Sequence, residues 1–282
     1  MTASRSPSNR PHTLHVHRQG QGPPILCLHG HPGSGAAMSV FTQFLAQQFT
    51  TLAPDLRGYG RSRYPNAFTM ADHLTDLRAL LDQESIERCF VLGWSLGGIL
   101  ALELALRCPE RFQGLVLVAT AAAPRSRHPA ITWTDQLYTG VASLLNRVSP
   151  GWRWNIETFG KRSLYRYLLQ QHVPSAYQYL AYEGLPAYLG TSRQANRALQ
   201  QALRAGYNRT AAIKQLQMPS LMLVGESDYH IAPQASLETA AALPDCQLIC
   251  YPNVAHLFPW EIPKRIEADI TAWIASQPLA KE

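Results

Sequence analysis

The sequence places one serine in a setting suited to nucleophilic catalysis. Residues 93–98 read Gly-Trp-Ser-Leu-Gly-Gly and lie between an apolar, strand-like run at 90–93 and a helical pattern at 96–107. Glycines on both sides permit the sharp strand-to-helix turn that lifts a serine hydroxyl clear of a sheet. Because a buried strand precedes this motif and a buried helix follows it, we predict that Ser95 is a nucleophile rather than an ordinary turn serine.

A serine hydroxyl is barely nucleophilic at neutral pH, so it requires a base. Ten histidines are available. His256 follows the last strand-like run, 247–251, at the carboxyl edge where open α/β sheets carry their active sites, and we predict that it is the general base. We interpret His230 as an ordinary loop residue. Six others lie on an edge-like strand or in helical or inserted segments: His12, His15, His17, His73, His128 and His172.

A carboxylate must hold the imidazole tautomer and stabilise the imidazolium. The run at 221–224 is followed by Gly-Glu-Ser-Asp at 225–228, which offers both Glu226 and Asp228 at the expected edge. The loop after the preceding strand is an unsuitable location, because nothing acidic occurs between Glu110 and Asp135. We predict that Asp228 is the orienting acid, with Glu226 as the alternative.

Charge that develops on a carbonyl oxygen is best stabilised by rigid backbone donors, the arrangement called an oxyanion hole. One predicted donor is the amide of Leu96. The second is the amide of His31 in the segment His-Gly-His-Pro-Gly at 29–33, because Pro32 has no N–H. The alternative, that His29 and Gly30 only shape a turn, is compatible with this role of the His31 amide. Trp94, next to the nucleophile, is expected to contact the substrate.

Short apolar runs alternate with helical patterns along most of the chain. Most runs are too continuously apolar to be half-exposed, which predicts a mostly parallel sheet flanked by helices on both faces. The first run alternates and predicts an antiparallel edge. The strand-like runs lie at 12–18, 25–28, 51–53, 90–93, 115–119, 221–224 and 247–251. The helical patterns lie at 37–48, 70–81 after a Thr69 cap with Asp72, 96–107, 235–242 and 262–275.

This alternation stops between residues 121 and 210. Eleven Lys or Arg and three Asp or Glu give the segment a net charge of +8, and it holds eight of the twelve tyrosines and three of the six tryptophans. A structureless loop of this length is implausible in a compact protein. We therefore predict an inserted helical lid at 121–210, with an aromatic inner ceiling, between core segments 1–120 and 211–282.

Composition excludes several classes of protein. Of the 282 residues, 46% are hydrophobic and 16% charged, and the longest apolar runs fall far short of the roughly 20 residues that span a bilayer. The polar N-terminus lacks a secretory signal, so we expect a soluble cytoplasmic protein.

Five cysteines are interpreted as reduced core residues. Cys246 and Cys250 are expected about 13 Å apart in an extended segment, which does not suit a shared metal ion. We expect no metal, no nucleotide cofactor and no nucleic acid partner.

Together these motifs resemble the α/β-hydrolase superfamily over about residues 12–276, apart from the insert. The resemblance rests on the motifs at 29–33, 55–62, 93–98 and 225–228 and on His256, and the order Ser, Asp, His agrees with that fold. The branch it resembles contains lidded esterases, epoxide hydrolases and carbon–carbon hydrolases. Epoxide hydrolases and haloalkane dehalogenases of this branch attack with aspartate, so Ser95 argues against both. The 93–98 motif is similar to that of pimeloyl-carrier-protein methyl ester esterases, and the 29–33 segment is similar to that of proline iminopeptidases.

The resemblance implies a serine carboxylesterase that cleaves small esters of apolar acyl groups through an acyl-enzyme. Three alternatives share the same motifs: a carbon–carbon bond hydrolase, an acyltransferase or perhydrolase, and a ligand-sensing protein. The basic insert would attract an acidic acyl carrier protein or an anionic membrane surface. A solvated helical face without any partner is the alternative for these arginines.

Overall fold

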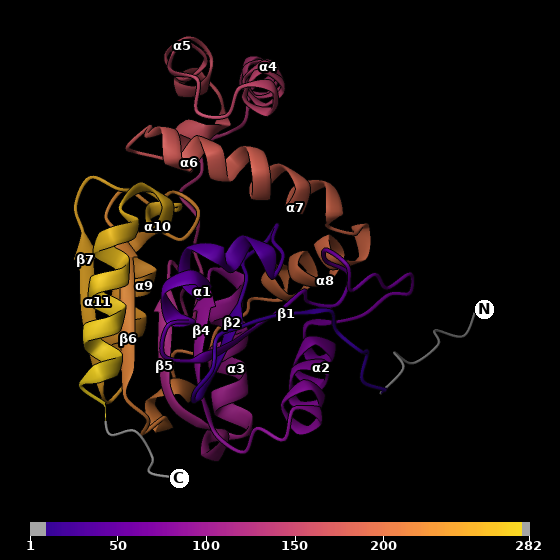
Figure 1. Cartoon of the computed structure of the whole chain (residues 1–282), viewed down its shortest axis with the longest axis vertical. Coiled ribbons are helices and arrows are strands. Elements are labelled where there is room, and N and C mark those ends of the chain that lie inside the picture. Colours follow the sequence, from indigo (N-terminus) through magenta and orange to yellow (C-terminus); the bar gives the residue numbers. More distant parts are fainter. Residues whose placement is uncertain (1–9, 278–282) are drawn as a thin grey trace.

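The computed structural model describes residues 10–277, so most of the polar N-terminus, where no secretory signal is expected, lies outside the described residues. Seven strands form one sheet in the order β1-β3-β2-β4-β5-β6-β7 (Figure 1). Their bounds are β1 Val16–Gln19, β2 Pro24–Leu28, β3 Thr50–Pro54, β4 Cys89–Trp94, β5 Phe112–Val118, β6 Ser220–Gly225 and β7 Cys246–Tyr251. β1 pairs with β3 in the antiparallel direction and every other pair is parallel. The predicted sheet, with its antiparallel edge, is confirmed.

The strand predicted at 12–18 begins only at Val16. The amides of His12 and His15 donate to side chains and not to a neighbouring strand: that of His12 to Asp76 at 2.6 Å and that of His15 to Ser62 at 2.8 Å.

The cysteine prediction was wrong at one position. Cys250 is exposed because β7 is the far edge strand of the sheet and only half of it is covered.

Helices cover both faces of the sheet, as alternate residues of the strands require. Leu26 and Leu28 of β2 belong to an apolar layer on one side that includes residues of α2 Met70–Gln83, α3 Leu96–Arg107 and α9 Pro233–Ala242. Ile25 and Cys27 pack on the other side with α1 Ser39–Leu45 and α11 Pro263–Ala275. All four strand residues are fully buried, so this part of the sheet is enclosed on both faces.

Four of the five helix predictions differ from the structure at an end, and those for α2 and α9 fall two residues short. The other two differ by a separate turn. The pattern at 37–48 gives a 3-10 turn, Ala36–Met38, and then the shorter α1. The pattern at 262–275 is preceded by a separate turn of helix, α10 Phe258–Glu261, and α11 starts at Pro263, which suits a first helical position. The predicted cap of α2 is present, with the Thr69 amide donating to the Asp72 carboxylate at 2.7 Å.

The segment between β5 and β6 is helical and contains no strand. Most of its helices lie beyond one end of the sheet, where α6 packs on α10, whereas α8 lies beside α2 (Figure 1). They are α4 Trp133–Val148, α5 Arg153–Thr158, α6 Pro174–Tyr179, α7 Leu185–Gly190 and α8 Arg193–Arg204. Within residues 10–277, no helix combines the length and the apolar character that crossing a bilayer demands.

Candidate active site

Ser95 occupies a strained turn between β4 and α3. Its backbone has φ 54° and ψ −115°, a region that non-glycine residues rarely adopt. The surrounding structure holds this conformation, because the Ser95 amide donates to the Val118 carbonyl at 2.8 Å and its carbonyl accepts the Thr120 hydroxyl at 2.8 Å. Such strain persists only where neighbours over-determine it, and it is concentrated at functional sites.

Gly93 and Gly97 allow β2, β4 and α3 to approach one another closely. A Cβ on Gly97 would lie 2.0 Å from the Leu28 carbonyl oxygen of β2, and one on Gly93 would lie 2.4 Å from the Gly97 oxygen. Neither distance is physically possible. Any larger residue would therefore push α3 away from the sheet and move Ser95.

Asp228 and His256 form a buried pair at the carboxyl ends of β6 and β7. Nδ1 of His256 lies 2.7 Å from Oδ2 of Asp228, and both side chains are less than a tenth exposed. The second carboxylate oxygen accepts the amides of His230 at 2.7 Å and Ile231 at 3.0 Å. Glu226, the alternative acid, is exposed. The structure thus brings together Asp228 and His256.

One contact brings Trp94 close to this pair, and a second brings Ser95 close to the 29–33 segment. The His256 ring lies 5.7 Å from the ring of Trp94, the residue before Ser95. A Cβ added to Gly30 would lie 3.2 Å from the Ser95 Cβ and 2.8 Å from the Trp94 ring, so only glycine fits at that approach. The loop after β2 and the turn after β4 are consequently in direct contact.

The two histidines of the 29–33 segment have different surroundings. His29 is buried, and its Nε2 accepts the Leu56 amide at 3.1 Å, so Nδ1 carries the proton that it donates to the Gly30 carbonyl. Burial lowers the pKa of His29 to about 4, and the ring is a neutral structural part of the loop. His31 contacts the Tyr59 hydroxyl through Nδ1 at 2.8 Å. Burial also lowers the pKa of His31.

Trp94 belongs to a row of aromatic rings that reaches into the inserted segment. Its ring lies 4.8 Å from that of Trp260, which stacks on Tyr179 of α6 at 3.9 Å. The buried Nε1 of Trp94 has no hydrogen-bond partner within the described part of the chain. The tryptophans expected in an aromatic ceiling are instead exposed on the outer surface: Trp133, Trp152 and Trp154.

Sequence reasoning missed two residues that support the pair. His230 was interpreted as an ordinary loop residue, yet its amide donates to Asp228 and its ring lies 5.1 Å from that of His256. Burial, with the nearby His256, lowers the pKa of His230 to about 3. The buried Glu261 accepts the amide of Ala255 at 2.8 Å. The only available signal was the Asp-x-His spacing at 228–230.

Among residues 10–277, the group of side chains able to hold a metal ion lies outside this site, at His15, His17 and Asp55.

A family model described as alpha/beta hydrolase fold matches residues 23–263. The chain belongs to this family. This chain is also similar to an uncharacterized protein of Mycobacterium tuberculosis. The two are 35% identical over 119 residues, which are 40% of this chain and 35% of that protein. The match therefore spans only about a third of that relative's length.

Two further similarities extend over nearly all of this hydrolase-fold chain. A pimeloyl-[acyl-carrier protein] methyl ester esterase of Nitrosospira multiformis is 24% identical over 281 residues, covering 92% of this chain and 97% of the relative. The solved structure of a thermophilic esterase from Thermogutta terrifontis superimposes with a TM-score of 0.66 at 26% identity, covering 93% of each chain.

Proposed function

We propose that this protein is a serine carboxylesterase in which Ser95 is the nucleophile, His256 the general base and Asp228 the orienting acid. The observation that carries the proposal is the buried 2.7 Å contact between Asp228 and His256 next to the strained turn of Ser95. The esterase names of similar proteins support the same reaction class.

In this proposal each group has a role in the reaction. Nε2 of His256 accepts the Ser95 proton while Oγ attacks the ester carbonyl carbon. The amides of Leu96 and His31 would stabilise the resulting oxyanion. His256 then gives the proton to the departing alkoxide, which leaves as an alcohol and yields an acyl-enzyme. Water attacks the acyl-enzyme, His256 takes a water proton and returns it to Ser95, and the carboxylic acid leaves.

Asp228 orients the base by fixing its tautomer. Because Oδ2 accepts from Nδ1 of His256, the proton resides on Nδ1 and Nε2 remains free to accept. The amides of His230 and Ile231 hold the other oxygen, so the carboxylate cannot rotate away.

The aromatic row supports an apolar acyl substrate. Trp94, Trp260 and Tyr179 are almost fully buried, and the row that they form begins at the Trp94 ring, next to that of His256. Pockets for apolar ligands are typically lined by such rings with a few polar groups for orientation. The unpartnered Nε1 of Trp94 would supply one such donor to a polar atom of the substrate. In this proposal, residues 121–210 act as the lid that supplies Tyr179.

We infer that the outer surface of the insert binds an acidic acyl carrier protein. Four apolar side chains of α4 lie on one helical face and are 56–81% exposed: Trp133, Leu137, Leu144 and Val148. Exposed basic residues, including Arg147 and Arg153, lie close by in the sequence, within a segment of net charge +8. The carrier-linked substrate in the printed name of the Nitrosospira relative supports this choice of partner.

The test of the catalytic proposal compares wild type with Ser95→Ala, using Ser126→Ala as a matched control on an exposed loop. A fluorophosphonate probe should label wild type and the control but not Ser95→Ala. Turnover of methyl esters with acyl chains of increasing length should fall by at least about 10⁴-fold in Ser95→Ala. Retained labelling or turnover in that variant would end the proposal.

A further inference from the structure

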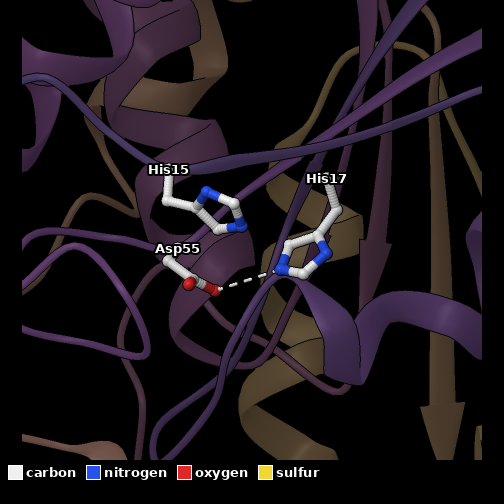
Figure 2. A group of neighbouring side chains, drawn as sticks. All are labelled: His15, His17 and Asp55. Atoms are coloured by element: carbon white, nitrogen blue, oxygen red, sulfur yellow. Dashed lines mark ion pairs between the residues drawn. The ribbon is translucent and has the colours of Figure 1, made fainter.

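Two histidines and an aspartate converge where β1 and β3 meet, at some distance along the chain from Ser95 (Figure 2). In the antiparallel register of these strands, His17 lies opposite Ala53, and the Asp55 amide donates to the His15 carbonyl at 2.8 Å. Extended residues two apart point to the same side. The three side chains therefore face one another, with the two imidazole rings 4.8 Å apart.

The distances between the potential ligand atoms are only slightly longer than those in a zinc site. One potential ligand atom from each residue can be chosen so that all three lie within 4.8 Å of one another, and Nε2 of His17 is 3.8 Å from Oδ1 of Asp55. In a tetrahedral zinc site with bonds of roughly 2.0–2.1 Å, ligand atoms lie about 3.3–3.5 Å apart. Small rotations of the two half-exposed imidazoles would bridge that difference.

The carboxylate of Asp55 is held in one orientation by backbone amides. Its side chain is 2% exposed, and the amides of Gly35 and Arg61 donate to Oδ1 and Oδ2 at 2.6 and 2.7 Å. Each carboxylate oxygen has two lone pairs, so each retains one for a cation. A buried carboxylate held by backbone donors, with two half-exposed imidazoles at its entrance, offers both a rigid anchor and a path for an ion.

We propose that His15, His17 and Asp55 bind a divalent first-row transition-metal ion, of which Zn²⁺ is the best match. Two imidazoles and one carboxylate suit Zn²⁺ and leave a fourth position for water. Calcium and magnesium require more oxygen ligands than this cluster supplies. The Gly35 amide links the site to the 29–33 segment, so a bound ion would fasten the loop that contacts Ser95.

The test titrates the chelator-treated full-length protein with Zn²⁺ by calorimetry and with Co²⁺ by visible absorption. His15→Gln and His17→Gln each remove one ligand, and His12→Gln is the matched control, half-buried on the same segment but outside the cluster. Wild type and the control should bind one ion per chain with the spectrum of low-coordinate Co²⁺. Each ligand variant should lose at least about tenfold in affinity.

A second variant tests the electrostatics of the cluster without removing a ligand. The Arg61 side chain is exposed and its charge acts on His17, so Arg61→Gln should tighten Zn²⁺ binding severalfold. At one fixed Zn²⁺ concentration, bound Zn²⁺ should raise the Tm of wild type and of His12→Gln by more than that of His17→Gln. Equal Zn²⁺ affinity in wild type, His15→Gln and His17→Gln, or an equal loss in His12→Gln, would overturn the proposal.

Discussion

Glu261 accepts the amide of Ala255, the residue before His256, through Oε1 at 2.8 Å. Its other oxygen accepts the amides of Gln170 and Gln171 from the inserted segment. One buried carboxylate thus fixes the loop of the proposed base and the insert to each other. Burial raises the pKa of Glu261, although the three amide donors act in the opposite direction.

We expect Glu261→Gln to lower both stability and activity. A glutamine has one acceptor oxygen and would direct N–H groups at a backbone amide, and a buried unsatisfied donor costs about 1–3 kcal/mol. Urea unfolding should show that loss, and kcat/KM should fall because the His256 loop is no longer held. Glu267→Gln, an exposed change on α11, is the control. Indistinguishable unfolding midpoints for the two variants would contradict this role.

The two acids after β6 should respond differently to neutralisation. Asp228→Asn removes the acceptor that fixes the His256 tautomer, and kcat should fall by about 10⁴-fold with little change in fold. Glu226→Gln should stay within a few-fold of wild type, because this side chain is exposed. Steady-state kinetics of both variants decide the matter. The reverse ranking would make Glu226 the functional acid.

The sequence was sufficient to predict that Asp228 and His256 lie at the same edge of the sheet, because each follows an apolar run and parallel strands carry their loops to one edge. The supporting roles of His230 and Glu261 could not be predicted, since they depend on backbone amides brought together only by folding. The His-x-His pattern at 15–17 was visible, but its proximity to Asp55 depends on the register of β1 against β3.

The insert shows a different limit of sequence reasoning. Its composition predicted a helical segment rich in aromatic residues, but composition does not say which helical face turns inward. Tyr179 reaches the aromatic row, whereas Trp133, Trp152 and Trp154 point to solvent. Burial of each ring depends on how α4, α5 and α6 pack on one another.

The buried His73 should make the protein less stable in mild acid. Burial is the main reason that its pKa is lowered to about 3, whereas an unfolded histidine titrates near about 6.5. Between these values the unfolded chain binds more protons than the folded chain. The stabilising contribution is therefore complete above about pH 6.5 and is lost as the pH falls towards 3.

Replacing His73 by leucine isolates this effect. Neither ring nitrogen of His73 has a hydrogen-bond partner within residues 10–277, so the variant breaks no such bond. The slope of unfolding free energy against pH should decrease by up to about 1.4 kcal/mol per pH unit between pH 6 and 4. Urea unfolding at several pH values measures the slope. Parallel curves for wild type and His73→Leu would show that His73 does not contribute.

Recruitment of an acidic carrier by the insert should depend on salt. Attraction between the basic insert and an anionic partner raises the association rate, and screening acts over about 10 Å at 0.1 M salt. For a carrier-linked ester, kcat/KM should fall as salt rises, while kcat/KM for a neutral soluble ester should stay constant.

Charge reversal on α4 makes this test specific to the insert. Arg147→Glu should lower kcat/KM for the carrier-linked ester severalfold at low salt and flatten its salt dependence, because it removes attraction at the exposed apolar face. Arg88→Glu gives the same change in net charge on the exposed residue before β4 and should have a much smaller effect. Equal effects of the two variants would mean that only net charge matters. If rates on an ester in anionic vesicles responded to Arg147→Glu and those on the carrier-linked ester did not, the face would serve a membrane surface and the carrier proposal would be wrong.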